Sequence, residues 1–365
     1  MMRWVKRFVR ITAITLNVAA AVMLWLSYAS PFVNPADFWL LAIFGVIYPL
    51  LIALNLLFLV LWIIRWKWYA IISGVTLIMG LPLLLNFFRF KPPSPPYTGK
   101  RDFTMMSLNV NLFRLYAWSK QPPTMDSIEA MVHRLRVDIL CLQEFYTDHD
   151  HFTEEDARIL FGEGAHIHYI YPPFNGGIGI ATFSRYPIVG GGEIHFEGSA
   201  NASIFTDVLI GSDTIRVYNN HLQSYRLKRR NLEFIQNSDY RKKANPIHEL
   251  LDLFTQIRGA VEKRAVQVLQ VRAHIDRSPY PVIVCGDFND SPISFTYKKM
   301  RGDLQDAFQE AGDGFGSTYK DIFPSFRIDY ALHSASLVAL DYTVVPSNYS
   351  DHKPILIPFN IRHDE

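Results

Sequence analysis

Two patterns of hydrophobic and polar positions divide the chain. Up to about residue 90 the sequence consists of long apolar runs, and from Asp102 onward short apolar runs alternate with amphipathic segments. Three of the long runs carry no charged residue and each covers the roughly 20 residues that a helix needs to cross a bilayer. We therefore predict a membrane domain of residues 1–90 with three transmembrane helices, at about residues 11–32, 38–64 and 68–88.

The basic residues that flank these runs indicate an orientation. Arg3, Lys6, Arg7 and Arg10 precede the first run, Arg65 and Lys67 lie between the second and the third, and the loop around Asp37 has no Lys or Arg. Cytoplasmic loops are enriched in Lys and Arg, so the N-terminus is expected in the cytoplasm. Three crossings then predict a multi-pass protein whose remaining chain is extracytoplasmic, although the basic residues just after the third run favour the opposite side.

The second part of the chain reads as an alternation of strands and helices. A proline-rich linker at residues 91–101 precedes it and is expected to act as a stiff spacer. Apolar periodicity predicts helices at residues 124–135 and 263–275. Strands are predicted at residues 103–110, 137–143, 178–183, 204–209, 214–219, 327–332 and 355–360.

A segment at about residues 225–262 is rich in Lys and Arg. It fits a solvated helical insertion, which is the ordinary meaning of a charge run. It also fits a basic arm that binds anionic lipid headgroups or a nucleic-acid backbone. The net charge of the whole chain is only +2, so it favours no polyanionic partner. The two cysteines exclude a disulfide framework, and Cys141 and Cys285 are expected as buried thiols.

The most informative motif lies at residues 281–290, Pro-Val-Ile-Val-Cys-Gly-Asp-Phe-Asn-Asp. Its β-branched run predicts a buried strand that delivers Asp287 and Asn289 at its end. Side chains alternate along an extended chain, so these two residues share a face and could hold a cation and a water near a phosphate. They could equally cap the helix that follows.

Five further stretches place polar side chains where strands are predicted to end. They contain Asn109 and Asn111, Gln143 and Glu144, Asn219 to His221, Asp329, and Asp351 with His352. Six such endings in one domain are hard to explain as capping. Carboxylate and amide oxygens suit Mg²⁺, and the sequence lacks the closely spaced His and Cys that zinc prefers.

With these motifs in this order, residues 102–365 resemble the endonuclease/exonuclease/phosphatase superfamily. The run Gly177-Ile-Gly-Ile-Ala-Thr-Phe-Ser-Arg-Tyr-Pro187 is also similar to a strand signature of that family. The resemblance implies an α/β (α+β) catalytic domain that is a four-layer α/β/β/α sandwich. Two mixed sheets would face each other, with helices outside and the site at one end of the sheets.

The resemblance also implies a role for each site residue. Glu144 would be the principal ligand of Mg²⁺ (or Mn²⁺ as a substitute), with Asn109 beside it and Asp351 as a further metal or water ligand. Asp287 would orient or deprotonate the attacking water, and Asn289 would help to hold phosphate and water. His352, paired with Asp329, would contact the scissile phosphate, and His221 would bind phosphate or donate a proton. Asn111 stands where some members have an aspartate, which leaves open whether a second metal binds there. In this reading Asn111, Asn289 and His221 contact substrate.

Three functions remain open at this level. The first is a membrane-anchored, Mg²⁺-dependent phosphodiesterase acting on lipid headgroups or other surface phosphoesters, with the bilayer and the substrate as its partners and no obligate protein partner. The second is an extracytoplasmic nuclease acting on DNA or RNA. The third is a binding module that has lost catalysis, which the retained site residues disfavour.

Overall fold

The computed structural model describes residues 2–90, 97, 99–114, 125–146, 164–171, 178–225, 246–320 and 327–363. Most of the predicted linker, and residues 226–245 of the predicted basic insertion, lie outside these ranges. The chain forms two compact units. The N-terminal unit contains Met1–Phe87, Tyr225–Ala265 and Asp290–Lys298, and the sandwich unit contains Phe88–Ser224, Val266–Asn289 and Lys299–Glu365.

The N-terminal unit is helical. Its elements are α1 (Met2–Ala29), the 3-10 turn η1 (Ser30–Phe32), α2 (Pro35–Phe38), α3 (Leu40–Val46), α4 (Tyr48–Ile64), α5 (Ala70–Met79) and α6 (Leu81–Leu84). Among the described residues, one helix, Met2–Phe32, is long and apolar enough to cross a membrane, and the same length and composition also fit a signal sequence. The pair Leu40–Val46 and Tyr48–Ile64 meets the same criterion only if both count as one span, because they are bent by 66°.

The described residues thus contain one candidate span, or two if the bent pair is one span, rather than the three transmembrane helices predicted at residues 11–32, 38–64 and 68–88, and they do not support the three-crossing, multi-pass topology. The second run is interrupted because Pro49, in the first turn of α4, cannot donate the hydrogen bond that would continue α3. The third run yields the ten-residue helix α5, which ends at Gly80 just before Pro82. An absence of charge does not reveal such breaks in the backbone.

A buried polar network joins α1, α4 and α5. The Asn17 side chain donates to Ser73 Oγ (2.6 Å) and accepts from the Trp62 indole N–H (2.9 Å). Ser73 Oγ in turn donates to Asn55 Oδ1 (3.2 Å). The Asn55 amide also donates to the Ala20 carbonyl of α1 (3.1 Å). Hydrogen bonds between apolar helices select one packing arrangement, since a shifted register would leave these groups unpaired.

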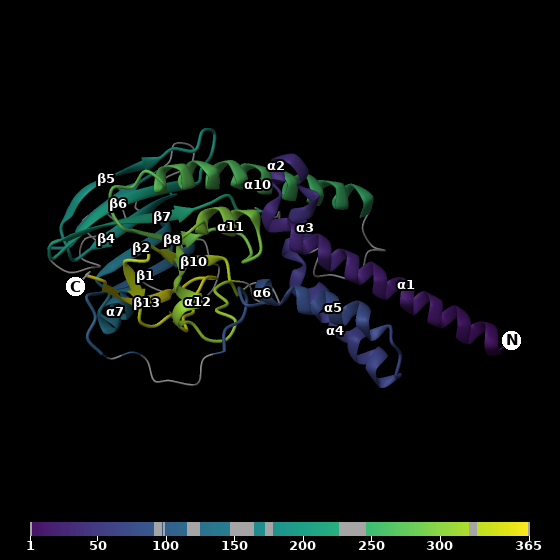
Figure 1. Ribbon diagram of the computed structural model, residues 1–365. Helices are drawn as coiled ribbons and strands as arrows, with labels where there is room; N and C mark the ends of the chain where they lie inside the picture. The colour runs from purple at the N-terminus through teal and green to yellow at the C-terminus, as the bar shows by residue number, and fades with distance from the viewer. Residues whose placement is uncertain are drawn as a thin grey trace. The chain divides into compact units, whose positions relative to one another are not determined.

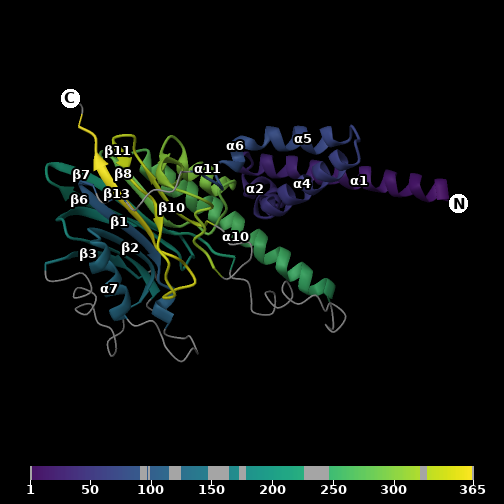
Figure 2. The same cartoon turned by 90° about the horizontal axis from the view of Figure 1, so that it is seen from below.

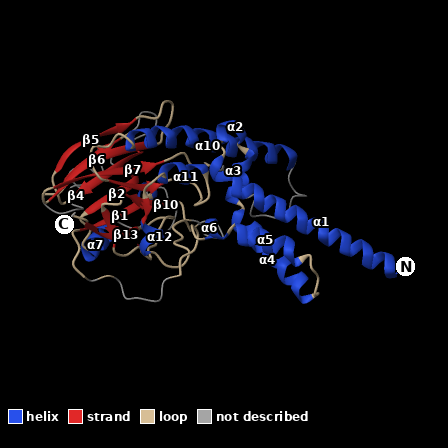
Figure 3. Ribbon diagram, viewed as in Figure 1, coloured by secondary structure: helices blue, strands red, loops and turns tan. Residues whose placement is uncertain are grey.

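The sandwich unit contains two mixed sheets (Figure 1 and Figure 3). The seven-stranded sheet has the order β11-β13-β1-β2-β4-β3, with β12 paired to β13. Its strands are β1 (Phe103–Asn109), β2 (Ile139–Tyr146), β3 (His166–Ile170), β4 (Ile178–Ser184), β11 (Leu337–Ala339), β12 (Thr343–Val344) and β13 (Ile355–Ile361). Among its described strand pairs, β1 and β2 are parallel and the others are antiparallel.

The second sheet is six-stranded, with the order β5-β6-β7-β8-β10-β9. Its strands are β5 (Ile188–Ile194), β6 (Ala202–Ile210), β7 (Asp213–His221), β8 (Val282–Asp287), β9 (Gln305–Asp306) and β10 (Asp329–His333). Here β7 and β8 form the parallel pair. Each sheet therefore has two central strands whose carboxyl ends lie at the same edge.

Alternation of side chains along the central strands explains the layering. Met105, Ile139 and Cys141 face the second sheet and pack in one buried cluster with residues such as Val217 and Ile283. Their sequence neighbours, among them Met106 and Leu140, face outward and pack in a second cluster with α7 (Met125–Leu135). A strand apolar on both faces is what a sheet covered on both sides requires.

Helices cover the outer faces of both sheets. Figure 2 shows α7 beside the seven-stranded sheet. On the six-stranded sheet, the last turns of α10 (Pro246–Ile275) are held by a bond between the Tyr218 hydroxyl and His274 Nδ1 (2.8 Å). The remaining helices are η2 (Asn111–Arg114), α11 (Phe295–Arg301) and α12 (Ala307–Ala311). The two mixed sheets with helices outside agree with the fold class expected from the sequence.

Differences from the predicted elements are local. The helix expected at residues 263–275 begins earlier, at Pro246. Strand β5 was not predicted, because its sequence Ile-Val-Gly-Gly-Gly-Glu-Ile contains glycines in place of β-branched residues. The glycines allow a close approach to β6, since a Cβ on Gly190 would lie 2.8 Å from Asp207 Oδ2.

A buried ion pair holds the chain just before β10. Arg327 Nη1 donates to Asp306 Oδ2 (2.9 Å), and the guanidinium lies over the ring of Phe308 (4.4 Å from its centroid). Asp306→Ala would leave a buried, uncompensated cation, so we expect a loss of about 3–5 kcal/mol in the free energy of unfolding. Asp276→Ala, which breaks an exposed pair with Arg272, should cost at most about 1 kcal/mol. Denaturant unfolding measures the loss of free energy in both variants. Equal losses would contradict the stabilising role of the buried Arg327–Asp306 pair.

Candidate functional site

The strand β8 ends in a turn that brings two polar side chains together. Gly286 has a φ of 119°, and a Cβ there would lie 2.1 Å from the Asn220 carbonyl oxygen of β7, so only glycine fits. Asn289 takes a left-handed conformation (φ 54°). Its backbone N–H donates to Asp287 Oδ1 (2.8 Å), and its side-chain amide donates to Asp287 Oδ2 (3.0 Å). Asp287 is thereby fixed in one orientation.

Glu144 is positioned by a β-bulge. The register between β2 and β4 shifts between Gln143 and Phe145, and Glu144 has a φ of 51°. A non-glycine residue in this region costs about 1–3 kcal/mol, a strain that is concentrated at functional sites. The strand does not end before Glu144, as the sequence suggested, but continues to Tyr146. The bulge, rather than the end of the strand, turns the Glu144 carboxylate toward Asn109.

Asn109 links the two sheets at the site. Its side-chain amide donates to Glu144 Oε1 (3.1 Å) and to Asp287 Oδ2 (3.2 Å). It lies at the carboxyl end of β1, while Asp287 lies at the carboxyl end of β8. His221, the last residue of β7, places its Nε2 3.5 Å from Glu144 Oε1. The carboxyl ends of the parallel pairs thus converge, as expected for α/β proteins.

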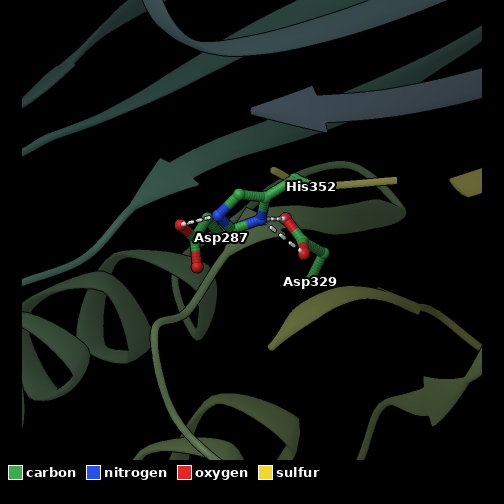
Figure 4. Close-up of side chains that lie close together, drawn as sticks. All are labelled: Asp287, Asp329 and His352. Carbon is green, nitrogen blue, oxygen red and sulfur yellow. Dashed lines mark hydrogen bonds and ion pairs between the residues drawn. The ribbon is translucent and has the colours of Figure 1, made fainter. Parts of the chain in front are cut away.

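His352 lies between two carboxylates (Figure 4). Its Nδ1 is 2.9 Å from Asp329 Oδ2 and 3.2 Å from Asp329 Oδ1. Its Nε2 points to the other side, 3.8 Å from Asp287 Oδ2. All three side chains are almost completely buried. Asp329 therefore orients the ring, and Nε2 remains directed at the space beside Asp287.

Asn111 and Asp351 form a neighbouring pair. The Asn111 side chain donates to Asp351 Oδ1 (2.9 Å), and the Asn111 backbone N–H donates to Asn109 Oδ1 (3.0 Å). The structure thus brings together all nine site residues predicted from the sequence. These are Asn109, Asn111, Glu144, His221, Asp287, Asn289, Asp329, Asp351 and His352.

The buried charges shift each other's protonation. Burial raises the pKa of Asp287 from 3.8 to about 7, an effect that the charge of His352 opposes and that of Asp329 adds to. Burial would lower the pKa of His352, but the carboxylates of Asp329 and Asp287 outweigh it and raise that pKa from 6.5 to about 10. At neutral pH the imidazole is therefore a cation with Nε2–H available as a donor.

Two groups of side chains could hold a divalent cation. Ligand atoms of Asp287, Asp329 and His352 lie within 4.8 Å of one another. However, both Asp329 oxygens are within hydrogen-bonding distance of the protonated His352 ring, which would repel a cation. Glu144 is more suitable, because its side chain is 28% exposed and lies beside the amide of Asn109. An open, oxygen-lined position that leaves room for water suits Mg²⁺ or Mn²⁺.

Comparison with known proteins agrees with this geometry. The model of the Endonuclease/Exonuclease/phosphatase family matches residues 106–352, more than half of the chain. The chain belongs to this family. A second family model, described as a domain of unknown function, matches residues 6–87. No curated protein is similar enough to the chain to count as a match.

Two solved structures of low sequence identity, with TM-scores of 0.50 or more, share the fold of this chain. An endonuclease/exonuclease/phosphatase from Beutenbergia cavernae has a TM-score of 0.51 at 17% identity, covering 72% of this chain and 72% of that one. A humanized D. rerio TDP2 with 14 mutations has a TM-score of 0.50 at 14% identity, covering 71% and 98%. An endonuclease/exonuclease/phosphatase family protein from Leptotrichia buccalis has a TM-score of 0.49 at 16% identity, covering 71% and 100%.

Some residues that support the site of this family member were not predicted. Thr318 Oγ1 accepts the backbone N–H of Asp329 (3.2 Å), and the Tyr319 ring packs edge-on against His352, with centroids 5.0 Å apart. Ser350 Oγ accepts the His352 backbone N–H (3.1 Å). Thr318 and Tyr319 follow a glycine-containing stretch without hydrophobic periodicity, so the sequence carries no signal of their position. The sequence places Ser350 directly before Asp351, but nothing in the pattern predicted its hydrogen bond to the His352 backbone.

The pairing of Asp329 with His352 predicts a pH effect on catalysis. Because the Asp329 carboxylate helps to raise the His352 pKa, Asp329→Asn should lower that pKa and remove the imidazolium at a lower pH. We expect the catalytic rate of this variant at pH 7 to be lower than that of the wild type by roughly two to four orders of magnitude. The alkaline loss of activity that the His352 pKa of about 10 predicts for the wild type should move toward neutral pH in this variant. A pH–rate profile that keeps its alkaline limb would contradict this role of Asp329.

Burial of Asp287 predicts that the site destabilises the fold. A carboxyl group whose pKa rises on folding contributes stability that is complete below its unfolded pKa and is lost as the pH rises through its folded pKa. With chelator present, the Tm should therefore fall between about pH 4 and pH 7. Asp287→Asn should remove this decline, because the variant has no carboxyl group to titrate at this position. Asp303→Asn, at a side chain 83% exposed, is the control and should leave the profile unchanged.

Proposed function

We propose that this family member is a membrane-attached, Mg²⁺-dependent phosphoester hydrolase that acts on phosphodiesters at a membrane surface, such as lipid headgroups. The hydrolase proposal depends on one observation: the buried His352 ring lies between the carboxylates of Asp287 and Asp329. The Asn109 amide donates to both Asp287 and Glu144 and so connects this group to the proposed metal ligand. A base, a cation and an oxygen-rich metal position in one place are the components that in-line attack on a phosphate requires.

Each side chain has a chemical task in this proposal. The Asp287 carboxylate, with a pKa of about 7, accepts a proton from the attacking water more readily than an ordinary aspartate would. Asn289 keeps that carboxylate in place through two hydrogen bonds. His352 Nε2–H donates to a phosphate oxygen as negative charge develops, while Asp329 holds the ring. His221 is partly exposed beside Glu144 and is placed to bind phosphate or to protonate the leaving oxygen.

Glu144 and Asn109 are the residues proposed to hold Mg²⁺, with Mn²⁺ as a substitute and Asp351 as a ligand of metal or water. A bound divalent cation would neutralise charge on the phosphate and its leaving group. The donor set fits such an ion, since it consists of carboxylates and amides and includes no cysteine. Asn111 donates to Asp351 and is proposed to contact the substrate rather than a second metal.

Attachment to a membrane is proposed from the N-terminal unit. The surface of α1 carries exposed large apolar residues, among them Trp4 (77%) and Phe8 (70%). Asn17 of α1 accepts a hydrogen bond from Trp62 of α4 and donates one to Ser73 of α5, which supports retention of α1 as a single crossing over its removal as a signal sequence. With a cytoplasmic N-terminus and one crossing, the catalytic domain would lie outside the cytoplasm. Protease treatment of intact cells tests this, and a fully protected domain would refute it.

Loss of the proposed metal ligand should weaken metal activation. Glu144→Gln keeps the shape of the side chain but removes its charge, so half-maximal activity should require at least roughly tenfold more Mg²⁺. The measurement is hydrolysis of an activated phosphodiester by the full chain over a Mg²⁺ titration. Glu193→Gln, on the edge strand β5 and beside His195, is the matched control. An unchanged titration in Glu144→Gln would exclude it as a ligand.

The class of substrate is tested by direct competition. We expect the purified protein to hydrolyse phospholipid headgroups in mixed vesicles in the presence of Mg²⁺ and to leave plasmid DNA intact. Nicked plasmid with intact lipid would favour a nuclease, whose binding should weaken steeply with salt. A protein that turns over neither these substrates nor an activated phosphodiester would be a binding module.

A further inference from the structure

The segment Asp290–Lys298 directly follows the site residues Asp287 and Asn289, yet it belongs to the N-terminal unit. The chain passes from one unit to the other between Asn289 and Asp290. Within the N-terminal unit this segment is fixed by one apolar contact cluster and by one buried ion pair. Neither contact is used in the mechanism proposed above.

The apolar cluster holds Ile293 against the helices. Ile293 is 1% exposed and packs with Leu24 of α1 and with Tyr48 and Leu51 of α4. Polar contacts flank it on both sides. Ser291 Oγ donates to the Gly45 carbonyl of α3 (3.4 Å), and the Asn86 amide donates to the Pro292 carbonyl (3.3 Å). The ammonium of Lys298 lies 4.2 Å from the centroid of the Phe32 ring.

The ion pair fixes the start of the same segment. Asp290 Oδ2 accepts from Arg264 Nε (3.1 Å) and from Thr296 Oγ1 (2.8 Å). The Arg264 guanidinium lies over the ring of Tyr225, 4.5 Å from its centroid. Arg264 is completely buried and Asp290 is 8% exposed, so the pair is shielded from solvent. Removal of one partner from such a pair is strongly destabilising.

We propose that Ile293 and Asp290 are positioning residues, through which the N-terminal helices hold the catalytic turn Asp287–Asn289 in its productive geometry. Only three residues separate Asn289 from Ile293, and each spans at most about 3.6 Å. Because this connection is short, a displacement of Ile293 is expected to displace Asn289 and the turn as well. A displacement of about 1 Å at a catalytic group can cost about 100-fold in rate. This inference rests on the proposed hydrolase function.

The test uses the full chain and a matched pair of leucines on α4. Leu51 contacts the Ile293 cluster and is 2% exposed, whereas its neighbour Leu50 is 65% exposed. Leu51→Ala and Ile293→Ala should each lower kcat roughly tenfold and leave KM nearly unchanged. Leu50→Ala should match the wild type. The double variant Leu51→Ala/Ile293→Ala should be no slower than either single variant, because both remove the same contact.

Hydrogen exchange provides a readout that does not depend on activity. In Ile293→Ala and Leu51→Ala the backbone N–H groups of Phe288 and Asn289, which donate to the Ile328 carbonyl and to Asp287 Oδ1, should exchange faster than in the wild type. The β1 amides should be unchanged. If Ile293→Ala does not fold, Ile293→Val provides a smaller truncation with the same expected direction.

Additive losses of kcat in the double variant, or unchanged exchange at Phe288 and Asn289, would overturn the positioning role. If the wild-type protein is inactive but the amides of Phe288 and Asn289 exchange faster in the variants, the hydrolase function is refuted. The positioning of the turn by Ile293 is then still supported. The two failures are therefore distinguishable.

Discussion

The structure of the site depends on a buried imidazolium held between two carboxylates. His352 could not remain charged at 5% exposure without Asp329 on one side and Asp287 on the other, because burial alone favours the neutral ring. Asp287 is buried in the same cluster, and burial raises its pKa to about 7 even though the charge of His352 opposes the rise. One cluster thus provides a donor and an acceptor of protons at neutral pH, at a cost in stability that the surrounding sheets must offset.

The two sheets make this cluster possible because each contains one parallel pair of strands. The carboxyl ends of β1 and β2 lie at one edge of the first sheet, and those of β7 and β8 lie at one edge of the second. Asn109 is hydrogen-bonded to both Glu144 and Asp287 and so joins the two edges. Below it, Gln143 donates to Asn219 Oδ1 across the sheets (2.6 Å). The site residues therefore converge because of topology rather than proximity in the sequence.

Much of this convergence was accessible from the sequence. The β-branched runs predicted the central strands, and polar residues at the ends of those runs predicted which side chains would meet. What escaped prediction depends on backbone geometry that leaves no periodic signal. The bulge that redirects Glu144 occurs inside a strand, and Thr318 and Tyr319 approach Asp329 and His352 from a segment without a pattern. In the N-terminal unit, Pro49 and Pro82 break runs whose composition alone suggested continuous transmembrane helices.

The most direct test of the account is a comparison of full-length wild type and His352→Ala in the hydrolysis of an activated phosphodiester, each with Mg²⁺ and with chelator. We predict Mg²⁺-dependent turnover in the wild type only, with both proteins folded by circular dichroism. A folded His352→Ala protein that retains the wild-type rate, or a wild-type rate that chelator does not affect, would contradict a metal-dependent phosphoester hydrolase centred on this histidine.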